Sequence, residues 1–166
     1  MSTMLTICRV DYAAAIAPIQ AIRCQVFQQE QGVAESLEFD GEDEAAVHFL
    51  AYWGDRAVGT TRLRYLAGTA VTVPAHVSPP NPETVAKIER VAVLREYRGQ
   101  CIGQKLMEAA IAYLHQQKIT VIKLNAQLSV QKFYERLGFQ PQGDIFDEAD
   151  IPHITMWYVP AQIVEA

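Results

Sequence analysis

The stretch that decides the fold reads Val91-Ala92-Val93-Leu94-Arg95-Glu96-Tyr97-Arg98-Gly99-Gln100-Cys101-Ile102-Gly103-Gln104. Residues Val85 to Leu94 have the composition of a strand. From Ile102 to Tyr113, apolar residues recur at the spacing of one helix face, which predicts a helix after the junction. A loop that enters a helix through glycines leaves several backbone N–H groups without partners at the positive end of the helix dipole. The junction therefore favours a main-chain site for a diphosphate, although an ordinary helix can begin in the same way. Its glycines fit neither a Walker loop nor a dinucleotide fingerprint.

The elements on either side of this junction follow from hydrophobic periodicity and turn residues. We expect strands at Leu5–Val10, Val47–Trp53, Ala57–Leu66, Val85–Leu94, Ile119–Leu124 and His153–Val159, with helices at residues 16–29, 102–113 and 130–137. Gly54-Asp55-Arg56 predicts a hairpin turn, and Ser129 and Gly138 are the expected N-cap and left-handed C-cap of the last helix. This order predicts an α/β fold, in the broad sense that includes α+β, with a mixed sheet.

Length and composition predict one globular domain that spans residues 1–166. The formal net charge of −5 argues against nonspecific binding to nucleic acid or to anionic membranes. The longest apolar stretch, Tyr12–Ile19, contains Pro18 and is too short to cross a bilayer. We expect a cytoplasmic location, because no targeting pattern occupies the first ten residues. Three cysteines without ligand spacing argue against a disulfide framework or a zinc site.

Charge is distributed unevenly along the chain. Residues 30–44 contain seven acidic side chains and no basic one, whereas residues 87–136 contain nine basic and four acidic side chains. One interpretation is that these are solvated loops and helix faces. The other is a bipolar site, with a basic region for a phosphorylated cofactor and acidic loops that face a cationic substrate.

Two motifs in this order resemble the GNAT superfamily of N-acetyltransferases. Arg98-x-x-Cys101-x-Gly103, after Ile88-Glu89-Arg90-Val91-Ala92-Val93, is similar to its Arg/Gln-x-x-Gly-x-Gly/Ala motif for acetyl-CoA. Downstream, the segment from Gln127 to Phe139 resembles its Asn-x-x-Ala-x-x-Phe-Tyr-x-x-x-Gly-Phe pattern. The N-terminal half and the tail Ile151-Pro152-His153-Ile154-x-Met156 resemble the ElaA-like branch, so the resemblance covers nearly the whole chain.

The resemblance implies a GNAT fold, with a mixed and mostly antiparallel central sheet flanked by helices on both faces, and acetyl-CoA as acyl donor. In this interpretation the strand end offers backbone groups to the pantetheine arm, and the following turn binds the pyrophosphate through main-chain N–H groups. The implied coenzyme-binding residues are Val91, Ala92, Val93, Arg98, Gly99, Gln100, Cys101, Ile102, Gly103, Gln104, Gln127 and Phe133. Cys101 departs from the usual glycine: its β-carbon is harmless at helical φ and ψ but crowds the phosphates if φ is positive. Gln127 replaces the usual Asn.

Tyr134 is the expected general acid, because a phenol aimed at sulfur can return a proton to the departing CoA thiolate. It could instead be a core tyrosine whose hydroxyl satisfies a neighbour. Glu89 is the first candidate for the base that takes a proton from the amine, since strand alternation would place it on the face of Val91 and Val93. It could equally be a structural residue that forms an ion pair with Arg90 or Lys87. His48 and His153 are alternative bases, and each could instead be a hydrogen-bonded structural histidine.

The expected reaction transfers an acetyl group to a primary amine by direct attack in a ternary complex. The acidic loops suggest a cationic small molecule or a lysine side chain as acceptor, with Glu30, Asp43, His48 and His153 as candidate acceptor-binding residues. We expect no metal, no nucleic-acid partner and no membrane partner, while a homodimer is possible. A covalent acyl intermediate on Cys101 is disfavoured, because the phosphates would occupy the same place.

Two alternative functions remain open at this point. Arg23-x-x-Val26-Phe27 and Asp40-x-x-Asp43 also resemble the N-terminal pattern of acyl-homoserine lactone synthases, which lack a clear counterpart of the turn from Arg98 to Gly103. Dependence on S-adenosylmethionine would identify such a synthase. A non-catalytic sensor that keeps the CoA site would bind CoA without releasing thiol in the presence of amines.

Overall fold

The computed structural model describes residues 4–160, which form two compact units. The first unit comprises the described residues up to Arg64 together with Ile88–Gln117, and the second comprises Tyr65–Lys87 together with the described residues from Lys118 onward. Strands β3 (Arg56–Ala67) and β4 (Thr84–Val93) run through both units.

In the first unit, β1, β2 and β3 form an antiparallel part of the sheet, and β4 is the next strand after β3. β1 (Leu5–Val10) pairs with β2 (Val47–Trp53), and β2 pairs with β3 across the predicted turn at Gly54. The β2–β3 register shifts between Ala51 and Tyr52. The strand at Leu5–Val10 and the hairpin are therefore confirmed.

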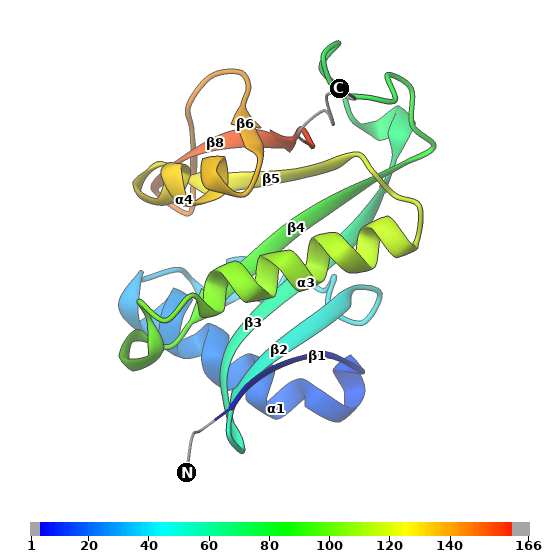
Figure 1. The fold of residues 1–166 in the computed structure, drawn as a ribbon. Coiled ribbons are helices and arrows are strands. Elements are labelled where there is room, and N and C mark those ends of the chain that lie inside the picture. The colour runs from blue at the N-terminus through cyan, green and yellow to red at the C-terminus, as the bar shows by residue number, and fades with distance from the viewer. Residues whose placement is uncertain (1–3, 161–166) are drawn as a thin grey trace. The chain divides into compact units, whose positions relative to one another are not determined.

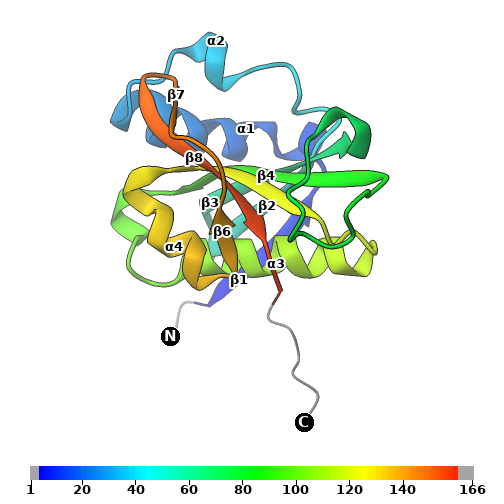
Figure 2. The same ribbon diagram turned by 90° about the horizontal axis from the view of Figure 1, so that it is seen from above.

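Helices cover both faces of the strands of the first unit. Figure 2 shows α1 (Tyr12–Arg23) on one face and α3 (Ile102–Gln116) on the other. Asp11 caps α1 by accepting a hydrogen bond from the Ala14 N–H at 3.1 Å. The expected helix to residue 29 changes after Arg23 into a π-helix, η1 (Cys24–Glu30), and the short α2 (Glu35–Glu38) follows. The turn after β4 contains the 3₁₀ segment η3 (Arg95–Tyr97).

The second unit is built around β5 (Ile122–Gln127) and β8 (Ile151–Tyr158), which are antiparallel (Figure 1). The start of β4 pairs in parallel with β5, and both β6 (Phe139–Pro141) and β7 (Phe146–Glu148) pair with β8. The remaining elements are η2 (Gly68–Ala70), η4 (Leu128–Val130) and α4 (Gln131–Arg136). Val77, Val85, Val121 and Trp157 form a buried cluster.

The strand order β1-β2-β3-β4-β5-β8-β6, with β7 on β8, gives an eight-stranded sheet in which β4–β5 is the parallel pair. The expected mixed, mostly antiparallel α/β fold is confirmed. β5 begins at Ile122 rather than at Ile119, and Ser129 lies inside η4 without capping α4. Gly138, with φ of +98°, does take the left-handed conformation expected after α4. Within residues 4–160, no helix combines the length and apolar character needed to span a membrane.

Candidate active site

The turn between β4 and α3, Leu94–Cys101, is named here the cradle turn. The first hydrogen bond of α3 runs from the Lys105 N–H to the Cys101 carbonyl at 3.0 Å. Within the described part of the chain, none of the backbone N–H groups from Gly99 to Gln104 donates a hydrogen bond. Six consecutive amides at the N-terminus of a fifteen-residue helix therefore remain available to an anion.

Two residues of the cradle turn have left-handed backbone conformations. Gly99 has φ of +77° and nothing within 4 Å of the position where a β-carbon would lie. Cys101 has φ of +59° and ψ of +18°, so this exposed cysteine occupies a conformation that glycine adopts far more easily. Of the two conformations considered for Cys101, the structure has the one with positive φ. In this conformation the β-carbon of Cys101 can crowd a bound phosphate.

The Arg98 side chain is turned back onto the protein. Its Nε donates a hydrogen bond to the Val93 carbonyl at 2.9 Å, and its Nη2 donates to Glu30 Oε2 at 2.8 Å. Glu30, expected to contact the acceptor, therefore places its carboxylate on an arginine of the cradle turn. The Val93 carbonyl, expected to face the pantetheine arm, already accepts this bond from Arg98.

The regular pleat of β4 is interrupted at Arg90, where φ is +55°. Strand alternation assumes extended backbone at every residue. It therefore does not carry across Arg90 and does not place Glu89 on the face of Val91 and Val93. Ala92 is buried, while Val91 and Val93 are half-buried.

Eight charged residues of the first unit are joined by ion pairs no longer than 3.2 Å and form what we call the arginine network, and Glu42 lies at its edge, 3.5 Å from Arg64. Arg23 and Arg62 are almost wholly buried, with 1% and 0% of their surface exposed. Arg62 forms a two-pronged pair with Asp40 at 2.8 and 2.9 Å and also contacts Asp43 at 2.9 Å. The members are Arg23, Glu38, Asp40, Asp43, Arg62, Arg64, Glu89 and Arg90.

The network shifts the pKa values of its carboxyl groups in both directions. Hydrogen bonds from Arg62 hold the pKa of Asp40 well below its usual range. Burial alone would raise the pKa of Asp43, but hydrogen bonds and charge from Arg23 and Arg62 lower it. At Glu38 burial dominates and raises the pKa, although Arg23 Nε lies 2.5 Å from its carboxylate.

Glu89 belongs to the arginine network. Its Oε2 contacts Arg62, and its Oε1 accepts hydrogen bonds from Nε and Nη2 of Arg64, both at 3.1 Å. Both carboxylate oxygens are thus engaged by guanidinium groups, and 8% of the side chain is exposed. This geometry supports the ion-pair interpretation, with Arg62 and Arg64 as the partners.

Asp43 and His48, two further candidates for acceptor binding, lie in the interior of the first unit. Asp43 pairs with Arg23 at 2.6 Å and with Arg62. His48 is fully buried, its Nε2 lies 2.8 Å from the Asp43 carbonyl, and its ring stacks on Tyr12. Burial lowers the pKa of His48, so the imidazole stays neutral at pH 7. His48 is fully buried and the Asp43 carboxylate is engaged by Arg23 and Arg62, so this geometry favours structural roles for both, and acceptor binding by either residue stays a prediction.

The acidic segment at residues 30–44 does not present a free negative surface. Five of its seven acidic side chains are ion-paired with arginines of the first unit: Glu30, Glu38, Asp40, Glu42 and Asp43. The interpretation of this segment as a surface for a cationic substrate is therefore not supported.

In the second unit, Tyr134 lies on α4 between aromatic neighbours. Its ring makes edge contacts with Phe133 at 5.0 Å and with Phe139 at 6.2 Å between centroids. Its hydroxyl makes no hydrogen bond to any residue in the range 4–160, so the alternative of a satisfied core hydroxyl is not supported. Burial raises the pKa of Tyr134 to about 12, which keeps the phenol protonated at neutral pH.

His153, on β8, is held in a defined orientation. Its Nδ1 lies 2.6 Å from the Ile151 carbonyl, which fixes the proton on Nδ1 and leaves the lone pair on Nε2. Glu148 Oε2 lies 3.6 Å from that Nε2, and Phe146 stacks on the ring. In the β5–β8 register, His153 is opposite Gln127. Of the three candidate bases, His153 combines a fixed tautomer with a carboxylate that can stabilise its charged form.

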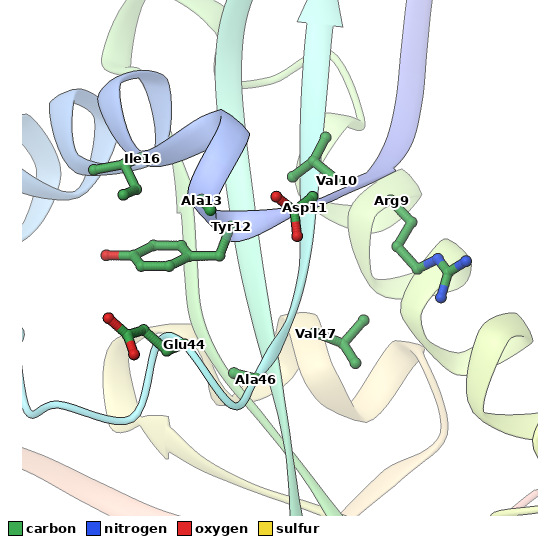
Figure 3. Close-up of a pocket in the computed structure, with 9 residues that line it drawn as sticks. All are labelled: Arg9, Val10, Asp11, Tyr12, Ala13, Ile16, Glu44, Ala46 and Val47. Atoms are coloured by element: carbon green, nitrogen blue, oxygen red, sulfur yellow. The ribbon is translucent and has the colours of Figure 1, made fainter.

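A pocket of about 580 Å³ lies beside the start of α1 in the first unit. Figure 3 shows Tyr12, Ile16 and Glu44 on one side of it, with Arg9 pointing away from them. None of the candidate catalytic, coenzyme-binding or acceptor-binding residues lines this pocket. Asp11 at its rim caps α1, and Arg9 donates a hydrogen bond to the Tyr113 hydroxyl at 3.3 Å, so these two lining residues have structural roles.

Sequence reasoning missed the arginines of β3 as site-forming residues. Arg62 and Arg64 occupy alternate positions in the middle of a hairpin strand, at Thr61-Arg62-Leu63-Arg64. A charged residue in the middle of a buried strand requires an opposite charge, and this signal could have linked the strand to the acidic segment.

Comparisons with known proteins agree with this architecture. A family model described as an acetyltransferase (GNAT) domain matches residues 13–159. The uncharacterized protein YyaT of Bacillus subtilis is 31% identical over 155 residues, which cover 92% of this chain and 94% of YyaT. Protein ElaA of Escherichia coli is 31% identical over 138 residues, which cover 81% of each chain.

Two crystal structures are similar over nearly the whole chain. That of Escherichia coli ElaA has a TM-score of 0.75 at 26% identity and covers 94% of this chain and 100% of its own. That of an acyl-CoA N-acyltransferase from Pseudomonas aeruginosa has a TM-score of 0.72 at 27% identity, with 95% and 100% covered. The chain is therefore an acyltransferase of the GNAT acetyltransferase family, and its similarity to ElaA supports the ElaA-like branch.

Proposed function

We propose that the protein transfers an acetyl group from acetyl-CoA to a primary amine by direct attack in a ternary complex. In this reaction the amine nitrogen forms a bond to the thioester carbonyl carbon, the carbon–sulfur bond breaks, and the sulfur leaves as a thiolate that takes up a proton. The observation that carries the proposal is the run of six unpaired amides from Gly99 to Gln104 in a chain of this family. These amides would hold the pyrophosphate of the coenzyme.

Tyr134 is the proposed general acid. Its raised pKa keeps the proton on the hydroxyl at neutral pH, and no neighbouring group in the described residues competes for that proton. Phe133, beside it on α4, would contact the coenzyme through its apolar ring, and Gln127 would lie at the end of β5 as a polar contact.

His153 replaces Glu89 as the proposed base. The Nδ1 hydrogen bond to Ile151 leaves Nε2 as the proton acceptor, and Glu148 would stabilise the imidazolium that forms. Glu89, with both oxygens on arginines, is assigned to the arginine network.

His153→Asn tests this assignment, because asparagine can keep a donor to the Ile151 carbonyl while it removes Nε2. We expect kcat to fall about 100-fold, the scale of a lost general base, together with a lower melting temperature because the stacking on Phe146 is lost. Glu148→Gln should cause a smaller loss of kcat. Wild-type turnover by His153→Asn, measured as thiol release across pH 6 to 9, would reject His153 as the base.

Calorimetric titration with CoA, followed by an acceptor screen that reads free thiol, tests the function as a whole. Matched primary amines that are cationic, neutral or anionic at a distal group should be compared at saturating acetyl-CoA. We expect micromolar CoA binding and thiol release with at least one class of amine. CoA binding with no thiol release for all of the amines would favour the sensor alternative. Thiol release that requires S-adenosylmethionine would favour the lactone synthase. Absence of CoA binding would reject the acetyltransferase, the sensor and the lactone synthase alike.

Cys101→Gly tests the conformation of the cradle turn. Glycine removes the cost of about 1–2 kcal/mol that a β-carbon imposes on the left-handed conformation. It also increases the conformational entropy of the unfolded chain, which offsets part of this gain. We therefore expect the free energy of unfolding to rise by about 0.5–1 kcal/mol. Cys101→Val should lower it, because a β-branched residue tolerates this conformation worst. Urea titration measures both changes. A Cys101→Gly variant less stable than the wild type would contradict the left-handed assignment.

A further inference from the structure

The end of the π-helix η1 contacts the cradle turn through the carboxylate of Glu30. Glu30, the last residue of η1, lies 2.8 Å from Arg98 Nη2 through its Oε2, and the same oxygen lies 4.0 Å from Arg95 Nη2. The Glu30 side chain is 17% exposed and that of Arg98 is 42% exposed. The Glu30 carboxylate is thus mostly covered while the Arg98 guanidinium stays open to solvent, and the contact is a charge-assisted hydrogen bond at normal distance.

Arg98 uses a second nitrogen to close the turn on itself. Its Nε donates to the Val93 carbonyl, so one guanidinium joins the end of β4, the middle of the cradle turn and the end of η1. The planar guanidinium has the fork geometry for this double contact, whereas a lysine ammonium does not.

The part of the turn before Arg98 has further contacts: Arg56 donates hydrogen bonds to Glu96 at 3.0 Å and to the Tyr97 hydroxyl at 3.1 Å, and the Tyr97 N–H bonds to the Leu94 carbonyl at 2.9 Å. Leu94 is anchored by its N–H to the Val58 carbonyl at 2.9 Å, and the Arg98 N–H bonds to the Arg95 carbonyl at 3.2 Å. From Gly99 to Gln104 the described backbone donates no hydrogen bond. Arg98 is thus the last residue before these unpaired amides whose side chain contacts other elements, through Val93 on β4 and Glu30 on η1.

We propose that Glu30 is a positioning residue for coenzyme binding: it holds Arg98, and Arg98 holds the cradle turn in the shape that presents its amides to a diphosphate. The inference rests on the proposed function and assigns Glu30 to the coenzyme rather than to the acceptor. Without Glu30, the turn has to be ordered during binding, and this ordering weakens coenzyme affinity without altering the groups that carry out the reaction.

Glu30→Ala and the isosteric Glu30→Gln test the proposal by calorimetry with CoA and by steady-state kinetics with one active amine. We expect the Kd for CoA and the KM for acetyl-CoA to rise about tenfold in Glu30→Ala and less in Glu30→Gln. The kcat at saturating acetyl-CoA and the KM for the amine should stay within about twofold of the wild type. Glu35→Ala, an exposed acid of the same segment, is the matched control and should change neither constant.

A double-mutant cycle separates positioning from general loss of structure. In the Arg98→Ala background, adding Glu30→Ala should cause no further loss of CoA affinity. Wild-type CoA affinity in Glu30→Ala, or a raised KM for the amine alone, would overturn the proposal. A wild-type protein that binds no CoA would instead reject the proposed function itself.

Discussion

Tyr134→Phe should lower kcat about 100-fold, the lower end of the range for a lost general acid. The phenol is the proposed donor of the proton that the departing thiolate needs, and phenylalanine keeps the ring in its contacts with Phe133 and Phe139. The KM for acetyl-CoA and the melting temperature should change little, because the hydroxyl makes no hydrogen bond within residues 4–160. Thiol release at saturating acetyl-CoA measures the effect.

Tyr52→Phe is the matched control, since it removes a phenolic hydroxyl from β2 without touching α4. It should retain wild-type kcat. The raised pKa of Tyr134 adds a second signature, because the wild-type rate should show no alkaline decline from this residue below about pH 10. Full activity in Tyr134→Phe would remove the tyrosine from the mechanism.

Arg62→Met should lower the free energy of unfolding by about 3–5 kcal/mol, the usual cost of removing one partner from a buried ion pair. Methionine fills most of the space but leaves the carboxylates of Asp40 and Glu89 without their central cation. Arg62→Lys, which keeps the charge but loses the two-pronged geometry, should cost less and provides a measurable variant if Arg62→Met does not fold. Urea titration at pH 7 measures both.

Arg56→Ala is the control for Arg62→Met, because Arg56 pairs with Glu96 at the surface with 57% and 47% of the side chains exposed. An exposed pair of this kind contributes less than about 1 kcal/mol. If Arg62→Met destabilised the protein no more than Arg56→Ala does, the arginine network would not be a stabilising feature.

Acid titration gives the network a further signature with a definite sign. The pKa values of Asp40 and Asp43 are lower in the folded protein than in the unfolded chain. Their ion pairs therefore stabilise the fold fully above about pH 4, and this stabilisation is lost as pH falls through the folded-state values. Arg62→Met should show a shallower loss of stability below pH 4 than the wild type.

The sequence-based predictions succeed where a local pattern determines the structure. Leu5–Val10 has strand composition and Gly54-Asp55-Arg56 lies between two β-rich runs, so these elements match their expected bounds closely. The elements that were missed, α2, β6 and β7, are three or four residues long. Such short segments are stabilised by their tertiary partners rather than by their own periodicity.

The site was only partly predictable for the same reason. The glycines around Cys101 identify the cradle turn from local chemistry, and the structure supports that prediction with unpaired amides. The partners of Glu89 could not be found in this way, because Arg62 lies 27 positions away and pairs with it only after β3 and β4 form. Strand alternation was not a reliable basis for placing Glu89 on the face of Val91 and Val93. The positive φ of Arg90 interrupts the strand there, and this backbone irregularity has no sequence signature.

The arginine network also has a consequence for the natural history of this chain. Arg23, Arg62 and Arg90 each serve two or more carboxylates, so losing any one of them exposes several partners at once. Replacing one such cation alone should therefore destabilise the fold more than replacing it together with a carboxylate at position 38, 40 or 43. We therefore expect these positions to covary among descendants, as coupled exchanges rather than as independent replacements.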